Sequence, residues 1–298
     1  MTISQIDLNF MGRKGSIATY IIPHAMGVAI VDPGPETALP ALIAALNERG
    51  LTPHDVTHIL VTHIHLDHSG SAGWFAGQGA QICVHPVGIP HAINPEKLVA
   101  SAQRLYGDWM EKLWGEIKPV PAANLIEVQD EMEIKAGDAH ICAIHTPGHA
   151  AHHVSYIFED VIFSGDVGGT RFQPELYVRL PFVPPETNLE QWRESLRRMC
   201  DTGCGRIAPT HFGIFEDAPA HLSYCEQYLN AVEAWLVRNM PTIPDVATLQ
   251  ARFVDFLDEQ SRAAGLSEPV RLMFDTGNPA AFAAHGLFRY WHKVRNVI

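Results

Sequence analysis

The chain has 298 residues, of which 47% are hydrophobic and 18% charged, and this length and composition are typical of a globular protein with a large core rather than a disordered chain. Its 21 lysines and arginines against 33 aspartates and glutamates give a net charge of −12, which argues against a nucleic-acid partner because phosphate binding needs a concentrated basic surface. No stretch approaches the roughly 18 uninterrupted apolar residues of a membrane span, and the first residues lack the apolar run of a signal peptide. We therefore expect a cytoplasmic protein with no membrane or nucleic-acid partner.

The first part of the chain predicts a hairpin, a helix and a strand that ends in a polar cluster. Residues 16–22 and 27–31 are β-rich runs separated by a short break. Leucine and isoleucine at helical spacing then predict a helix over residues 37–49. A strand over about residues 56–62 leads directly into the sequence HIHLDHSG, so the polar cluster lies at the end of a strand.

A helical insertion is predicted at about residues 86–124. The sequence Asn-Pro-Glu from Asn94 predicts a helix start, with a capping residue and a proline in the first turn. Along the helix, apolar residues recur every three or four positions, and core packing is the preferred role for Tyr106, Trp109 and Trp114. The insertion is expected to be either a lid or pocket wall, or a packed surface helix.

The second half begins with strands and ends with helices. Residues 125–163 contain several short strands, the last of which leads into the sequence SGD. Residues 187–200 predict a helix that begins with a capping box formed by Thr187 and Glu190. Residues 219–298 are predicted to be helical. Two β-rich halves with helices outside each predict an α/β fold of four layers, αββα, with the polar loops gathered at one edge.

Three histidines and an aspartate lie within six residues at the end of the strand over residues 56–62. They are His63, His65, Asp67 and His68. Side by side, these groups would repel and desolvate one another unless a cation or solvent took up their lone pairs. Imidazole and carboxylate are common metal ligands, so the pattern favours metal binding over a solvated loop.

Three further strand ends supply candidate ligands in loops rich in glycine and proline. They are His149 in HTPGHA, Asp166 in FSGDVGG and His211 in PTHFG. With the first cluster they make five imidazoles and two carboxylates, enough for two metal ions if one carboxylate bridges them. Structural zinc sites are usually rich in thiolates, and the absence of cysteine among these seven residues argues against a purely structural metal site.

The motifs THIHLDHSG, TPGHA, SGDVGG and PTHFG, in this order, resemble the metal-binding motifs of the metallo-β-lactamase superfamily. The resemblance covers about residues 16–215. It implies a four-layer αββα sandwich with a catalytic domain over residues 1–218, which includes the helical insertion. A helical extension over residues 219–298 would then cover the site or form a homodimer contact.

The same resemblance implies a ligand set for two divalent metal ions, with zinc expected first and iron or manganese as alternatives. His63, His65 and His149 would hold the first ion, Asp67, His68 and His211 the second, and Asp166 would bridge them.

The motifs are closest to those of the glyoxalase II and lactonase-like group, because zinc β-lactamases lack the bridging carboxylate that Asp166 supplies. The expected reaction is cleavage of an ester, thioester or lactone in a small-molecule substrate by a metal-bridging hydroxide, which Asp67 orients or deprotonates. The lactonases carry a tyrosine shortly after the bridging aspartate. Residues 167–172 contain none, and Tyr177 is a more distant candidate.

Other activities and other residues remain open at this point. The main alternative is an oxidoreductase similar to the persulfide dioxygenases, which use one iron; a β-lactamase, a phosphodiesterase or nuclease, and a non-catalytic metal-binding protein are less favoured. Asp32 is expected to form a turn or to support a ligand. For His152 and His153 a surface or core position is preferred to a role beside the metals.

Overall fold

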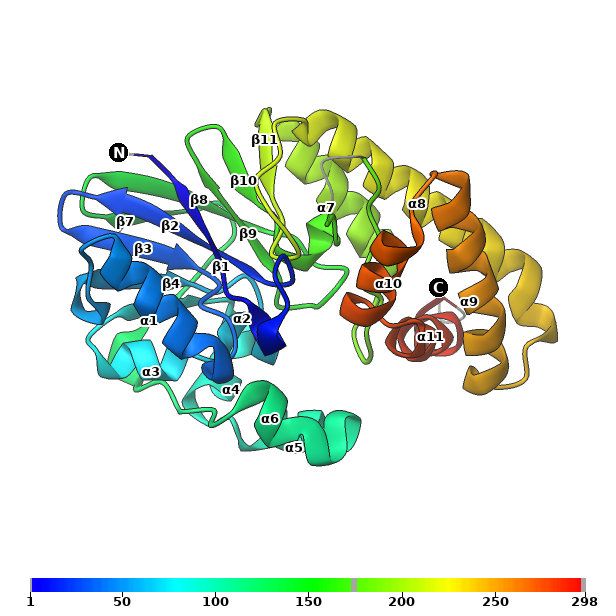
Figure 1. The fold of residues 1–298 in the computed structure, drawn as a ribbon, viewed down its shortest axis with the longest axis horizontal. Helices are drawn as coiled ribbons and strands as arrows, with labels where there is room; N and C mark the ends of the chain where they lie inside the picture. Colours follow the sequence, from blue (N-terminus) through cyan, green and yellow to red (C-terminus); the bar gives the residue numbers. More distant parts are fainter. Residues whose placement is uncertain (1, 173–175, 296–298) are drawn as a thin grey trace. The chain divides into compact units, whose positions relative to one another are not determined.

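The computed structural model describes residues 2–172 and 176–295, which form two compact units (Figure 1). The first unit comprises Met1–His145 and His152–Gly165, and the second comprises Thr146–Ala151 and Asp166–Ile298. The chain therefore leaves the first unit for six residues, returns to it, and leaves again immediately before Asp166. The domain boundary expected at residue 218 stays a prediction.

A six-stranded mixed sheet forms the first half of the first unit. Its strands, in spatial and in chain order, are β1 (Ser4–Asp7), β2 (Ala18–His24), β3 (Gly27–Val31), β4 (Val56–Leu60), β5 (Gln81–Val84) and β6 (Leu125–Glu127). The β1–β2 and β2–β3 pairs are antiparallel, which confirms the predicted hairpin, and the pairs from β3 to β6 are parallel. Parallel neighbours need crossover connections, and the helices of this unit lie in those connections.

Helices α1 (Leu39–Glu48) and α3 (Ala72–Gly77) pack on the outer face of this sheet (Figure 1). Their apolar side chains, among them Leu42 and Phe75, are fully buried against strand residues such as Ile59. The short helix α2 (Leu66–Ser69) follows β4 after a turn of five residues. The parallel strands and their covering helices thus fix the position of this turn.

The insertion between β5 and β6 contains α4 (Ile89–Ile93), α5 (Glu96–Tyr106) and α6 (Met110–Trp114). The Asn94 side chain accepts a hydrogen bond from the amide of Glu96 at 3.0 Å, in agreement with the predicted helix start. The predicted continuous helix is interrupted because Gly107 adopts a φ of 54°. Trp114 is 5% exposed, as predicted, but Trp109 is 57% exposed, so its predicted core position is wrong.

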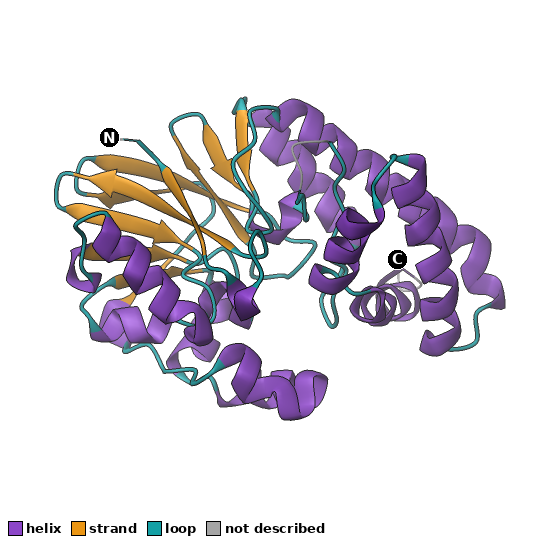
Figure 2. Cartoon of the chain, viewed as in Figure 1, coloured by secondary structure: helices purple, strands orange, loops and turns teal. Residues whose placement is uncertain are grey.

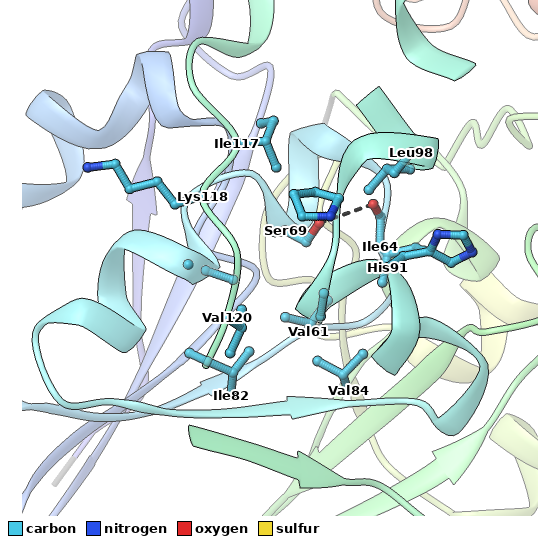
Figure 3. A pocket seen from close by; sticks show the side chains of 14 residues that line it. Val61, Ile64, Ser69, Ile82, Val84, His91, Leu98, Ile117, Lys118 and Val120 are labelled. Atoms are coloured by element: carbon cyan, nitrogen blue, oxygen red, sulfur yellow. Dashed lines mark hydrogen bonds between the residues drawn. The ribbon is translucent and has the colours of Figure 1, made fainter. Parts of the chain in front are cut away.

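A small apolar cavity lies between this insertion and the first sheet (Figure 3). Val84 and Ile64 line it from the sheet side, and Leu98 and Ile117 from the insertion. The volume of this cavity is about 30 Å³, far less than a substrate pocket needs. In Figure 3 the Ser69 hydroxyl donates to the Ile64 carbonyl at 3.1 Å, which fixes the turn beside the cavity. At this face the insertion packs as a surface layer.

The second sheet of the first unit faces the first sheet. Its strands in this unit are β7 (Met132–Ala136), β8 (Ala139–His145), β9 (Val154–Phe158) and β10 (Val161–Phe163), paired antiparallel in sequence. Between the sheets, the rings of Tyr20 and Phe163 lie 5.3 Å apart, and the Tyr156 hydroxyl donates to the Val61 carbonyl at 2.9 Å. The first unit therefore has an outer helical layer and two facing sheets.

The second unit is mainly helical (Figure 2). It contains α7 (Leu189–Asp201), β11 (Arg206–Ala208), α8 (Ala218–Asn239), α9 (Val246–Ala263), α10 (Glu268–Gly277) and α11 (Ala280–Arg289). Helix α7 is present as predicted, but its capping box is wrong. The extended residue Asn188 caps the helix by accepting from the Gln191 amide at 3.0 Å, while the Thr187 hydroxyl donates to the Val183 carbonyl. None of the helices in the described part of the chain has both the length and the apolar character to cross a bilayer.

Candidate metal centre

The first unit brings four of the predicted ligands together in one turn, and we call them the first donor set: His63, His65, Asp67 and His68. The turn begins where β4 ends and continues into α2, which carries the last two residues of the set. His63 Nε2 lies 2.9 Å from His65 Nδ1, and His68 Nε2 lies 3.6 Å from Asp67 Oδ2. His63 and His68 are buried, whereas the Asp67 side chain is 25% exposed. The set therefore combines two buried imidazoles with one carboxylate in contact with solvent.

Asp32 supports this set from the end of β3. It is fully buried and adopts a φ of 49°. Its Oδ1 accepts from the Thr62 amide at 2.8 Å, and its Oδ2 accepts from the Thr62 hydroxyl and from His68 Nδ1, both at 2.7 Å. A carboxylate at Nδ1 holds the proton there and leaves the Nε2 lone pair for a ligand bond. Asp32 thus orients His68, one of the predicted ligands, and its role as support of a metal ligand stays a prediction.

His152 and His153 are buried behind the first donor set. Their rings lie roughly parallel to that of His63, at 6.2 and 5.2 Å between centroids, and His152 Nδ1 accepts from the Ile64 amide at 3.4 Å. The preferred surface or core position thus takes the form of a core position, and both rings also lie near that of the predicted ligand His63. Gly165 is required beside them, because a Cβ there would lie 2.5 Å from His153 Nε2.

The second unit brings together the other three predicted ligands, which we call the second donor set: His149, Asp166 and His211. His149 Nδ1 lies 2.8 Å from the Pro181 carbonyl, which can only accept, so this nitrogen carries the proton and Nε2 carries the lone pair. That Nε2 lies 3.3 Å from Asp166 Oδ2, and His211 Nε2 lies 3.5 Å from Asp166 Oδ1. One carboxylate thus presents a different oxygen to each of two imidazoles.

Helix α7 supports the second donor set through Trp192. The Trp192 indole donates to the Val167 carbonyl at 2.9 Å, and its ring stands edge-on to that of His149 at 5.8 Å. Gly148 allows this approach, because a Cβ there would lie 2.4 Å from Trp192 Cα. The close packing of a loop glycine on the helix therefore orients His149.

Both donor sets have the chemistry of a site for divalent metal ions. In each set, nitrogen or oxygen lone pairs face one another at short range, an arrangement that a shared cation stabilises. The His149 Nε2 and Asp166 Oδ2 atoms show this most directly, since the proton of His149 lies on the other ring nitrogen. Nitrogen and oxygen donors without thiolate suit zinc, iron or manganese.

Tyr177 does not belong to either set. It is 2% exposed, and its ring packs against Tyr224 at 6.0 Å and Phe274 at 4.9 Å. Burial raises the pKa of its hydroxyl, in part offset by Arg179. Tyr177 therefore packs among aromatic side chains of the second unit, and its role as the counterpart of the lactonase tyrosine stays a prediction.

Two curated relatives are similar to this chain in sequence. The metallo-beta-lactamase fold-containing protein ST1585 of Sulfurisphaera tokodaii is 29% identical over 161 residues, which cover 53% of this chain and 60% of that protein. The atrochrysone carboxyl ACP thioesterase of Aspergillus fumigatus is 25% identical over 172 residues, which cover 56% of this chain and 31% of that protein. The chain thus spans 60% or less of the length of these relatives.

Solved structures and a family model agree on the fold. The metallo-beta-lactamase family protein TTHA1429 of Thermus thermophilus matches with a TM-score of 0.65 at 24% identity, over 94% of this chain and 89% of that one. The structure of ST1585 matches with a TM-score of 0.62 at 23% identity, over 76% of this chain and 85% of that one. The predicted metallo-β-lactamase fold, with two sheets flanked by helices and a helical C-terminal region, is confirmed. The family model described as the metallo-beta-lactamase superfamily matches residues 12–211, more than half of the chain, and the chain therefore belongs to that superfamily.

Proposed function

We propose that the protein is a hydrolase that uses two divalent metal ions, zinc in the first instance, to cleave an ester, thioester or lactone. The position of Asp166 carries this proposal. Its two oxygens lie 3.3 and 3.5 Å from the Nε2 atoms of His149 and His211, as expected of a carboxylate that bridges two ions. A bridging carboxylate favours a two-ion site and makes β-lactam cleavage the less favoured activity.

The ligand assignment of the proposal divides the seven donors between two ions. One ion would be held by His63, His65 and His149 and the other by Asp67, His68 and His211, and Asp166 would be shared between them. The spacing inside the first donor set supports this division, because His63 lies closest to His65 and His68 lies beside Asp67. In the second set, each histidine faces its own oxygen of Asp166.

The two ions, when bound, supply a hydroxide nucleophile at neutral pH and a Lewis acid for the scissile carbonyl. The chain contributes orientation and proton transfer. Asp67 is the proposed catalytic residue, because it is the more exposed of the two carboxylates and can orient a water molecule or accept its proton. Asp32 keeps the His68 proton on Nδ1. The rings of His63 and His68 are buried, and the surrounding side chains restrict their rotation.

We propose a thioester first among the three substrate classes. The support is the similarity of this chain to the atrochrysone carboxyl ACP thioesterase of Aspergillus fumigatus. The match covers 31% of that protein and 56% of this chain.

Metal analysis combined with a hydrolysis screen tests the proposal. We expect about two zinc, manganese or iron atoms per chain by mass spectrometry, and turnover of a thioester, ester or lactone that chelation removes and metal addition restores. A phosphodiester in the same screen should not be cleaved. Replacement of the exposed His140, which is not a proposed ligand and whose Nδ1 lies 3.1 Å from Glu133, is the matched control and should leave metal content unchanged.

Two outcomes contradict the proposal. One iron per chain together with thiol-dependent oxygen uptake identifies an oxidation similar to that of the persulfide dioxygenases. Two bound metals without turnover of any ester, thioester or lactone in the screen identify a binding protein.

A further inference from the structure

Helix α8 is hydrogen-bonded to the loop that carries Asp166. His221, in the first turn of α8, donates from Nε2 to the Gly168 carbonyl at 2.7 Å. Gly168 closes the short helical turn Gly165–Gly168, which contains Asp166. Both partners of this hydrogen bond are buried, so water cannot replace the donor.

Arg171 fixes the orientation of this histidine. Its Nη1 and Nη2 donate to the two carboxylate oxygens of Asp217 at 2.7 and 3.0 Å, and Nη1 also lies 3.3 Å from His221 Nδ1. A guanidinium group can only donate, so Nδ1 accepts and the single proton of His221 lies on Nε2. Burial lowers the pKa of His221 to about 4, which keeps the ring neutral as this arrangement requires.

The same arginine is joined to the segment that carries His211. The Arg171 amide donates to the His211 carbonyl at 2.6 Å, and the Arg171 carbonyl accepts from the Phe212 amide at 3.3 Å. The guanidinium lies 4.0 Å above the Phe215 ring, which packs near His221 at 6.0 Å. The group of Asp217, Arg171 and His221 therefore contacts the Asp166 turn through the His221 side chain, and the His211 segment through the main chain of Arg171.

We infer that His221 and Arg171 are positioning residues that hold the Asp166 and His211 segments in their ligand geometry. Neither side chain is among the proposed ligands, and the inference rests on the proposed function because it assigns those segments to the metal site. Among the described residues, loss of the His221 donor leaves the buried Gly168 carbonyl with the Cys225 thiol as its remaining hydrogen-bond donor, at 3.5 Å. A thiol is a weak donor and cannot hold the turn in the same way.

Three substitutions at one position test the inference. His221→Gln keeps an amide donor near the position of Nε2, His221→Asn holds its amide too far from Gly168, and His221→Phe keeps the ring without a donor. Leu229→Ala, a fully buried position on the same helix, is the control for general loss of stability. The readouts are hydrogen exchange at the amides of residues 169–171 in the metal-stripped protein, and zinc affinity by competition with a chelator.

We expect His221→Phe and His221→Asn to exchange these amides about 10-fold faster and to bind one of two zinc ions 10- to 100-fold more weakly, with His221→Gln close to the wild type. Leu229→Ala should lower the thermal midpoint without either change. The inference is overturned if both variants lacking the donor retain wild-type exchange and affinity, or if Leu229→Ala reproduces their effects. A wild type that binds no zinc, but in which His221→Asn accelerates exchange, overturns the proposed function while the positioning role stands.

Discussion

The two donor sets are built in different ways. The first set lies within six consecutive residues, so one turn after one strand fixes all four side chains, and a single buried carboxylate, Asp32, orients His68. In the second set, three ligands come from three separate segments, and helices orient them through backbone carbonyls, as Trp192 does at Val167 and His221 at Gly168. The local set depends on its own turn and on one buried carboxylate, whereas the dispersed set depends on the packing of the helical unit.

The largest effect that separates the two sets is expected for Asp67→Ala. Asp67 is the proposed proton acceptor, so the substitution should lower kcat/KM about 1,000-fold. Asp67 is also a proposed ligand, so the metal content should fall by one ion. Steady-state kinetics on the substrate found in the screen, with metal analysis of the same sample, measure both. The fold should remain intact, because the Asp67 side chain is partly exposed. Wild-type turnover in this variant would exclude Asp67 as the catalytic residue.

Acid should destabilise the folded protein through His221, the residue that donates to the loop of the second donor set. Burial lowers the pKa of His221 to about 4, from 6.5 in the unfolded chain, so below pH 6.5 the unfolded state binds the proton more readily than the folded state. The free energy of unfolding should therefore fall as the pH drops from about 6.5 to about 4, by up to about 3 kcal/mol for this residue. His85 in the first unit, also lowered to about 4 by burial and by neighbouring histidines, adds to the loss.

Urea unfolding of the metal-stripped protein at pH 7 and at pH 4.5 measures this acid sensitivity. His221→Gln cannot titrate in this range, so its stability should change less between the two values. Equal loss in this variant and in the wild type would assign the acid sensitivity to other groups.

A smaller effect, confined to the first set, is expected for Asp32→Asn. The amide keeps the size of the side chain but no longer holds the His68 proton on Nδ1 as a carboxylate does. Zinc affinity at one of the two sites should fall 10- to 100-fold. Asp138→Asn, which alters an exposed hydrogen bond to the Ala25 amide, is the matched control. Unchanged zinc binding would show that the turn alone orients the first set.

The smallest effect is expected away from both sets, at Trp109 in the insertion. Its side chain is 57% exposed and lies beside the Lys112 amine at 4.7 Å, so Trp109→Ser should change the free energy of unfolding by no more than about 0.5 kcal/mol. Trp114→Ala, at 5% exposure, should cost about 3 to 5 kcal/mol in the same denaturation assay. A large loss at Trp109 would reveal a contact that its exposure does not suggest.

The sequence predicted the features that depend on local pattern. The hairpin of β2 and β3, the strand that ends at the first donor set and helix α7 follow from apolar periodicity and turn residues, and all are present. Neighbouring ligand types within one turn indicated a metal site without knowledge of the fold. For the second set, the residues were found through their motifs, because no spacing rule joins positions 149, 166 and 211.

Features that depend on tertiary packing could not be predicted in this way. The periodicity of residues 98–113 does not show that Gly107 ends α5, nor that Trp109 then faces solvent. Thr187 has the residue type of a helix cap, but Asn188 takes that role because its backbone is the extended residue before α7. Similarly, nothing in the local sequence of His221 indicates that it donates to a carbonyl 53 residues earlier in the chain.

The hydrogen bond between His221 and Gly168 limits how the helical region can be exchanged between proteins. A chain that ended at residue 218 would retain all seven proposed ligands and lose the donor that holds the turn around Asp166. A graft of foreign helices after Asp217 would need a neutral hydrogen-bond donor at the position of His221 and an acceptor for Arg171. Helix α8 and the loop that carries Asp166 therefore form one structural unit, and exchange of the helix alone would leave that loop without its donor.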